Sequence, residues 1–253
     1  MAKWLALAVL AGLLGAAAPA SPPETEIIVS NSEGGSLPNF IAQVMADAYS
    51  RVGATAVVKT FPAARSIEMA NSGVTDAEAL RGPGLERDFP NLIPVPEPVI
   101  MLEYHAYTVG KPLEGEGWAA LRGKRICVNL GEKLIEERTR GFPREMARGT
   151  DAALKMLKAG RCDAVVANQF VWLTIERENL GTFCTSSAPL DAFPLFHYVN
   201  RRHADLVPGL TAALRDMKES GSLDRHLADD PNYRQLTQIK SRHDCSATNA
   251  DRR

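Results

Sequence analysis

The chain has 253 residues, of which 45% are hydrophobic and 23% charged, and its formal net charge is −1. This length permits one large domain or two domains of roughly 100 residues, each with its own core. The balanced charge and the lack of a basic patch with interleaved aromatics exclude nucleic acid as the expected partner.

Residues 1–20 have the order of a cleavable secretory signal. Lys3 provides the positive start, residues 4–14 are apolar without a charge, and Ala-Pro-Ala at 18–20 reads as a small-x-small cleavage site. The apolar stretch is shorter than a membrane-spanning helix, and no later apolar run reaches that length. We therefore expect an exported protein that resides in the periplasm.

Strands and helices alternate through the first half of the chain. Strands are predicted at 27–29, 56–58 and 76–80, helices at 37–52 and 63–71, and extended segments at 92–95 and 99–107. The first helix places its apolar residues on one face: Leu37, Phe40, Ile41, Val44, Met45, Ala48 and Val52. Gly53 and Gly73 follow the two helices and are expected to end them.

The same alternation restarts near Gly110. Strands are predicted at 125–128 and 163–167, helices at 132–140, 150–159, 170–178 and 206–217, and an extended segment at 195–199. Residues after 240 are polar and are interpreted as a flexible tail over 241–253. Two successive units of this kind predict an α/β fold with mostly parallel sheets covered by helices on both faces.

Four cysteines follow the signal: Cys127, Cys162, Cys184 and Cys245. An exported protein meets an oxidising compartment, so disulfides are expected. Three full pairings are possible, and Cys162–Cys184 is our first choice because these residues flank one strand–helix unit. Neither the cysteines nor the five histidines have metal-ligand spacing, and no Gly-rich phosphate loop occurs, so we expect no metal and no cofactor.

Several local motifs, in this order and spacing, resemble one known family. The motifs are Pro-x-x-Arg at 62–65, Gly-x-x-Asp at 73–76, Leu-Glu-Arg at 85–87, Leu-x-Gly-Lys at 121–124 and Gly-Arg-x-Asp-Ala at 160–164. Behind a signal sequence, they resemble the bacterial extracellular solute-binding proteins of family 3, the periplasmic receptors related to those of polar-amino-acid ABC importers. The resemblance covers roughly residues 25–228.

The resemblance implies a two-lobed, type II periplasmic binding protein-like fold with two hinge crossings, at 99–107 and 195–199. Lobe one would comprise 25–104 plus 197–240, and lobe two 108–193. The ligand, a small polar solute, would lie between the lobes where strand carboxyl ends open onto helix starts, and hinge closure would bury it. The resemblance also implies that the protein is a monomer and that it delivers its solute to a membrane ABC permease.

Polar groups follow the first strand of each unit. Asn31 and Ser32 lie in a loop of small polar residues between a strand and a helix, and Asn129 and Gly131 hold the equivalent place in the second unit. Free N–H groups and amide or hydroxyl side chains there suit a polar oxygen of a ligand. The alternative, that these loops only cap the following helices, remains open.

Three arginines are candidates for binding an anion, because a guanidinium grips a carboxylate through two parallel hydrogen bonds. Arg81 ends the third strand and ranks first, and Arg65 opens a helix near the same edge and ranks second. Arg87 matches the family's local motif better, but we interpret it as a solvated surface charge.

Two departures from the family pattern bear on the ligand. Amino-acid receptors usually have aromatic residues after the first strand, whereas none occurs here before Phe40. They also place an Asp after the second-lobe strand to bind an ammonium group, and here that position is Asn168. We therefore expect a polar or anionic ligand rather than a free α-amino acid.

The favoured function is capture of a solute without chemistry. One alternative is an exported α/β hydrolase-like enzyme, which needs a nucleophile with a positioned base. Ser30, Ser32 and Ser36 are available, but no motif ties any of them to a histidine. The other alternative is a ligand-sensing accessory module of the same fold, which sequence does not separate from a transport receptor.

Overall fold

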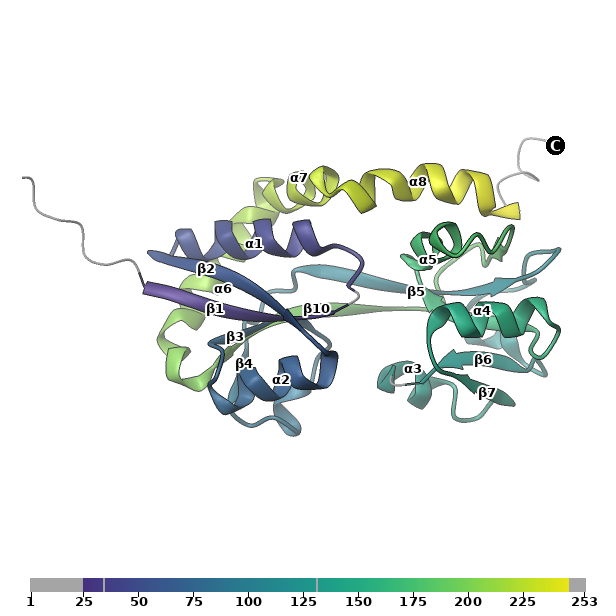
Figure 1. Cartoon of the computed structure of the whole chain (residues 1–253), viewed down its shortest axis with the longest axis horizontal. Coiled ribbons are helices and arrows are strands. Elements are labelled where there is room, and N and C mark those ends of the chain that lie inside the picture. The colour runs from purple at the N-terminus through teal and green to yellow at the C-terminus, as the bar shows by residue number, and fades with distance from the viewer. Residues whose placement is uncertain (1–24, 34, 131, 246–253) are drawn as a thin grey trace, which may run out of the picture.

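A computed structural model describes residues 25–33, 35–130 and 132–245. Two α/β lobes lie side by side, and two long strands run between them (Figure 1). The proposed signal at 1–20 and the candidate ligand residue Gly131 lie outside the described residues. Within the described part of the chain, no helix is both long and apolar enough to cross a membrane.

Lobe one is built on three parallel strands in the order β2-β1-β3. Its first elements are β1 (Thr25–Ser32), α1 (Pro38–Ser50), β2 (Ala54–Phe61), α2 (Ala63–Ser72), β3 (Ala77–Arg81), the 3-10 turn Leu85–Arg87 and β4 (Leu92–Pro94). Helix α1 packs the apolar face predicted from its periodicity into the core. Gly73 ends α2 with φ of 80°, a left-handed conformation that favours glycine.

The two crossing strands make the sheets of both lobes continuous. They are β5 (Ile100–Thr108) and β10 (Asp191–Asn200), and they pair antiparallel from Asp191 opposite Tyr104 to Leu195 opposite Ile100. The strand order is β2-β1-β3-β10-β5-β8-β6-β7. The predicted crossings are confirmed, although β10 begins four residues earlier than expected because its first residues pair with β5.

Lobe two repeats the strand–helix pattern. Its elements are the 3-10 turn Gly117–Leu121, β6 (Ile126–Asn129), α3 (Lys133–Arg138), β7 (Arg144–Ala147), α4 (Thr150–Lys158), β8 (Ala164–Asn168), α5 (Val171–Arg177) and β9 (Cys184–Thr185). Strand β7 was not predicted, because it is short, only half of its residues are apolar, and it pairs only with β6 at the edge of the sheet.

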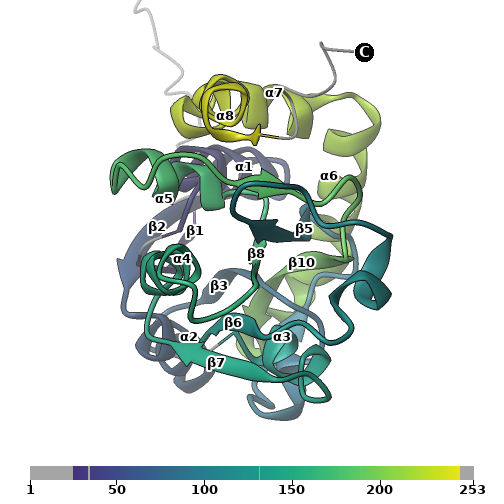
Figure 2. The ribbon, with the colours of Figure 1, turned by 90° about the vertical axis from the view of Figure 1, so that its right-hand side faces the viewer.

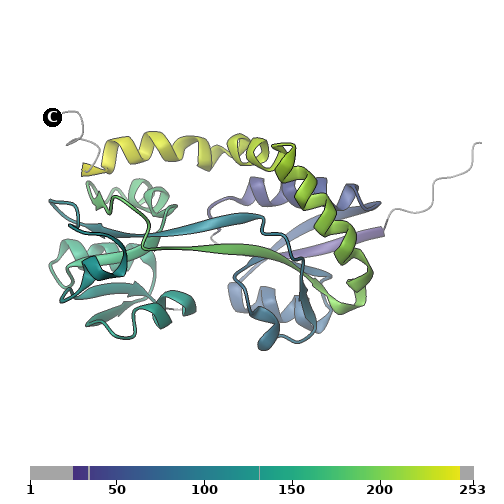
Figure 3. The same ribbon diagram turned by 180° about the vertical axis from the view of Figure 1, so that it is seen from behind.

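Three helices complete the chain after the 3-10 turn Arg201–Leu206: α6 (Val207–Glu219), α7 (Ser222–Asp229) and α8 (Pro231–His243). From behind, α6 rises past lobe one, and α7 and α8 then run along one long edge of the molecule towards lobe two (Figure 3). The expectation of a flexible tail is wrong for residues 241–245, because 241–243 belong to α8 and Cys245 forms a disulfide, and residues 246–253 of that expected tail lie outside the described residues. Most residues of α8 are polar and only Ile239 is fully buried, which is why the sequence of this helix reads as a polar segment.

Two disulfides form, and neither is the predicted Cys162–Cys184 pair. Cys127 bonds to Cys162, with Cα atoms 5.7 Å apart, and Cys184 bonds to Cys245, with Cα atoms 4.8 Å apart. The predicted Cys162–Cys184 bond is therefore wrong. Strands β6 and β8 are paired neighbours, so the start of β8 brings Cys162 beside Cys127, and α8 carries Cys245 back to β9.

Candidate functional site

A cavity of about 250 Å³ lies between the lobes, against one face of the crossing strands. We call it the interlobe cavity. Lobe one contributes the ends of β1 and β3 and the start of α1, the crossings contribute Ile100, Leu102 and Leu195, and lobe two contributes Asn168 and Phe170. Ligands of open α/β folds bind where strand carboxyl ends converge in this way.

Arg81 is the charged residue of the interlobe cavity, and it is already held by lobe one. Its Nη2 lies 2.6 Å from Glu78 Oε1 and donates hydrogen bonds to Ser32 Oγ and, at 3.2 Å, to the Ala63 carbonyl. Its Nε is buried and donates to no other described group. Lobe one thus orients the Arg81 side chain, and its Nε–H remains available to donate a hydrogen bond to a ligand.

Glu78 is the counter-charge that holds Arg81. The Glu78 residue is 1% exposed, and its Oε2 accepts hydrogen bonds from Ser30 Oγ at 2.8 Å and Ser66 Oγ at 2.6 Å. Burial raises the pKa of this carboxyl, while the charge of Arg81 and the two hydroxyls oppose the rise. The pair reduces the net positive charge that Arg81 presents to a ligand.

The other wall of the interlobe cavity is neutral and partly aromatic. Asn168 ends β8, and its Oδ1 accepts a hydrogen bond from the backbone N–H of Phe170 at 3.0 Å. Phe170 and Phe40 are both buried and line the cavity from opposite lobes. No aromatic residue follows the first strand before Phe40, and the rings of Phe40 and Phe170 provide the aromatic part of the cavity lining.

The structure brings together Asn31, Ser32, Arg81 and Asn168 from the predicted set. Arg65 does not line the cavity and is exposed on α2, and Arg87 is exposed and donates to the Gly84 carbonyl at 3.3 Å. Sequence reasoning placed Arg65 by its position at a helix start, but α2 turns its side chain outward.

Asn129 also lies outside the interlobe cavity. Its Nδ2 donates to Glu132 Oε1 at 3.0 Å, and its Oδ1 accepts from the Gly149 N–H at 3.0 Å. Both bonds tie loops of lobe two together, so Asn129 acts here as a support of the loop after β6.

Glu132 is a polar residue of this region that the sequence analysis missed. Its Oε2 is buried and accepts no hydrogen bond from the described residues. Burial raises the pKa of its carboxyl, although contacts with Asn129 and Tyr104 oppose the rise. The signal that could have found it is its place directly after a strand end, next to the residues that were selected.

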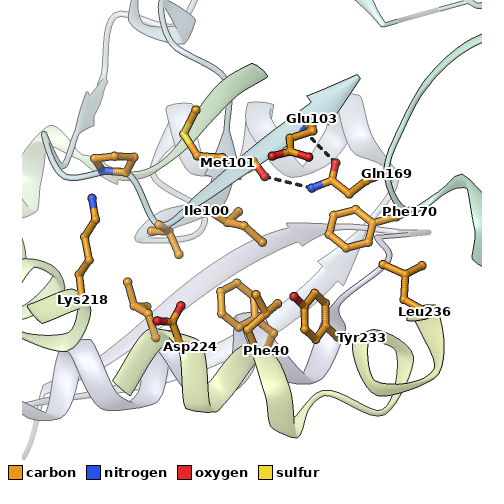
Figure 4. Close-up of a pocket in the computed structure, with 14 residues that line it drawn as sticks. Phe40, Ile100, Met101, Glu103, Gln169, Phe170, Lys218, Asp224, Tyr233 and Leu236 are labelled. Atoms are coloured by element: carbon orange, nitrogen blue, oxygen red, sulfur yellow. Dashed lines mark hydrogen bonds between the residues drawn. The ribbon is translucent and has the colours of Figure 1, made fainter. Parts of the chain in front are cut away.

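A larger cavity of about 430 Å³ lies between β5 and the C-terminal helices (Figure 4), and it shares Phe40, Ile100 and Phe170 with the interlobe cavity. We call it the rear cavity. Met101 and Glu103 line it from β5, Leu102 lines the interlobe cavity, and Ile100 lines both cavities. The interlobe cavity is the better candidate site, because the ends of β1 and β3 and the charged side chain of Arg81 line it.

A metal-binding grouping is not found among the described residues. No group of three or more His, Cys, Asp or Glu side chains there could hold a metal ion. The buried His197 contacts the Tyr49 hydroxyl at 2.8 Å and the Ala79 carbonyl at 3.2 Å, and burial lowers its pKa to about 4. It is therefore a packed core histidine.

No protein-family model matches the sequence, and a search of curated proteins finds no match. Solved structures do match in fold. A "probable amino-acid ABC transporter extracellular-binding protein" from Bacillus subtilis is 16% identical, with a TM-score of 0.67, over 83% of this chain and 98% of that one.

Two other solved structures are also similar in fold. A histidine kinase sensor domain with similarity to periplasmic binding proteins is 17% identical, with a TM-score of 0.64, over 82% of this chain and 96% of that one. The GluR0 ligand-binding core in complex with L-glutamate is 12% identical, with a TM-score of 0.64, over 81% and 97% of the two chains. The chain therefore has the two-lobed fold of periplasmic binding proteins.

Proposed function

We propose that this protein is a periplasmic solute-binding protein that captures a small polar or anionic solute in the interlobe cavity and delivers it to an ABC importer. The observation that carries the proposal is Arg81, which faces this cavity from the end of β3 with its Nε free to donate. The fold supports the proposal, because extracellular-binding proteins of amino-acid transporters share it.

The geometry favours a small ligand with one anionic or strongly polar group. Arg81 offers a charge-assisted hydrogen bond, and Asn31, Ser32 and Asn168 offer neutral ones. Because Glu78 already pairs with Arg81, a ligand with several negative charges would meet too little positive charge. The cavity volume is below the roughly 300–1,000 Å³ of pockets for drug-sized ligands, which also favours a small solute.

Capture without turnover fits the contacts better than hydrolysis does. Ser32 accepts a hydrogen bond from Arg81, and Ser30 donates to Glu78. Neither hydroxyl contacts a histidine among the described residues, whereas an activated serine needs a positioned base. The contacts of Ser30 and Ser32 in the described part of the chain therefore fit support of Arg81 and Glu78 better than a Ser–His pair.

A sensing role is the second candidate, and one observation favours it: a histidine kinase sensor domain shares this fold. The two candidates predict different partners at the membrane, a permease or a signalling receptor. Cross-linking of the exported protein in intact cells, followed by identification of the captured membrane protein, separates them.

The direct test is a thermal-shift screen of the purified protein against small acids, neutral amides, amines and amino acids, followed by calorimetry on the hits. A ligand that binds only the native state raises the melting temperature. Acids or polar neutral compounds should stabilise the protein, with one molecule bound per chain and no product formed. Stabilisation by cationic compounds alone, or conversion of the bound compound, would refute the proposal.

Export is tested separately from binding. Mass spectrometry of protein recovered from the periplasm should show a chain that starts at or near Ser21, because the Ala-Pro-Ala sequence at 18–20 precedes it. A chain retained with its first twenty residues would contradict the periplasmic assignment and leave the binding measurements unaffected.

A further inference from the structure

Helices α7 and α8 form a third connection between the lobes, separate from β5 and β10. Helix α7 packs against α1 of lobe one, and α8 packs against α5 of lobe two. Viewed from the lobe-two end, both helices lie above α1 and α5, on the far side from α2 and β7 (Figure 2). We call residues 222–245 the strap.

The strap is joined to lobe one at its middle, where α7 ends and α8 begins. Asp230 is fully buried, and its carboxylate accepts from the N–H of Phe40 in α1 at 2.9 Å and of Asn232 in α8 at 2.8 Å. Asn232 Nδ2 donates to the Ser36 carbonyl at 2.8 Å. Because Ser36 and Phe40 also line the interlobe cavity, this joint lies directly beside the candidate binding site.

The strap is joined to lobe two at its end by a covalent bond. Cys245 is disulfide-bonded to Cys184 of β9, and backbone hydrogen bonds of 2.8 Å join Phe183 to both His243 and Cys245. Glu176 of α5 pairs with Arg242 and His243, each at 2.6 Å. The strap therefore cannot leave lobe two while the disulfide is intact.

The rear cavity separates the strap from the hinge. Ile100 and Met101 line it from β5, and Tyr233 and Leu236 line it from the strap (Figure 4). The strap is thus a connection set apart from the crossing strands rather than a helix packed flush on them.

Two connections at separate places restrict relative motion more than one hinge does. Lobes joined by β5 and β10 alone could both close and twist, since two adjacent strands act as a single flexible joint. The Asp230 contact is a second joint. The lobes can then still close by rotating about a line through this joint and the crossing strands, but twisting of one lobe against the other is opposed. Restricting the free protein to fewer arrangements also lowers the ordering cost of any later binding.

We propose that the strap is a disulfide-locked third connection that limits how the two lobes move relative to each other. The lock is the Cys184–Cys245 bond, and the pivot is the Asp230 joint. The proposal concerns the ligand-free protein, so its test does not depend on which solute the protein binds.

The test compares the disulfide that joins the strap to lobe two with the disulfide that is internal to lobe two. Nitroxide labels on keto-amino acids at the exposed positions Glu68 of α2 and Lys155 of α4 report the distance between lobes by double electron–electron resonance. The variant Cys184→Ser/Cys245→Ser releases the strap, and the matched control Cys127→Ser/Cys162→Ser removes a bond internal to lobe two.

The strap variant should broaden the distance distribution or add a second population, and the control should match the parent. An unchanged distribution in the strap variant would overturn the proposal. Equal broadening in both variants would also overturn it, because the effect would then be a general loosening of lobe two.

If the strap variant does not fold, Asn232→Ala gives the same test from the lobe-one side, with the same two outcomes. This change removes one hydrogen bond to the Ser36 carbonyl and leaves the Asp230 cap in place. Retention of the parent distribution in Asn232→Ala would then count against the proposal.

Discussion

The two walls of the interlobe cavity are built by different means. The lobe-one wall is a charged network in which Glu78 holds Arg81 and is itself held by Ser30 and Ser66. The lobe-two wall presents Asn168, whose amide oxygen accepts a hydrogen bond from the backbone N–H of Phe170, and the aromatic ring of Phe170. The difference teaches that lobe one carries a preorganised charge for the ligand, and lobe two contributes shape and neutral hydrogen bonding.

The largest expected effect comes from breaking the charged wall with Arg81→Gln. Loss of a charge-assisted contact costs about 1.5–3 kcal/mol, so affinity for an acidic ligand should fall roughly tenfold to a hundredfold in calorimetry. The melting temperature should fall too, because Glu78 loses its counter-charge in a buried site. The control Arg65→Gln, on the outer side of α2, should bind as the parent does. Equal losses in both variants would show that Arg81 has no special part in binding.

Asn168→Asp makes the two walls more alike by adding a negative charge to the neutral one. Repulsion at the opposite side of a small cavity should weaken binding of an anion by about tenfold and strengthen binding of an amine. The matched control is Asn179→Asp, an exposed position of lobe two with φ of 48° that tolerates Asp as well as Asn. Anion affinity that is unaffected by Asn168→Asp would mean that the ligand does not approach this wall.

Glu132→Gln tests the buried carboxyl near the lobe-two wall. Burial raises its folded-state pKa, so the folded protein binds a proton more tightly than the unfolded chain, and stability falls as pH rises through the folded pKa. The amide removes this loss, so Glu132→Gln should be about 1 kcal/mol more stable than the parent at neutral pH and equal to it in acid. Urea unfolding at several pH values measures this, with the exposed Glu137→Gln as the control. A parent-like pH dependence in Glu132→Gln would show that the carboxyl is solvated.

Asp47→Asn should have the smallest effect, and it lies away from both walls. Asp47 accepts from Arg51 at 2.8 Å and from Ser222 and His226 of the strap at 3.0 Å each, which joins α1 to α7. The hydrogen bond from Arg51 leads the causes that lower its pKa from 3.8 to about 2. A lowered pKa stabilises the fold above pH 3.8, and this contribution is lost as pH falls towards 2.

The Asp47→Asn variant should therefore be less stable by about 1 kcal/mol at neutral pH, once solvent screening is allowed for, and should lose less stability in acid than the parent. Urea unfolding at several pH values measures the difference. The exposed Asp205→Asn is the control and should behave as the parent. Identical acid sensitivity of parent and Asp47→Asn would show that this joint contributes nothing.

Local patterns were enough to predict the α/β class, the apolar face of α1 and the two crossing strands, because periodicity and turn residues report on the immediate neighbours of each residue. They also placed Arg81 and Asn168 at strand ends, and parallel strands bring such ends together. The same logic could not say which way Arg65 points, since a residue at a helix start can face the cleft or the solvent.

The tertiary structure alone decided the disulfide pairs, the Glu78–Arg81 pair and the path of the strap. Helix α8 is too polar for its packing to be predicted from an apolar face. Its course across both lobes depends on the buried Asp230 and on the disulfide from Cys245 to Cys184, 61 residues earlier. Each of these contacts joins segments far apart in the chain, and sequence patterns carry no information about which distant segments meet until the sheet order is known.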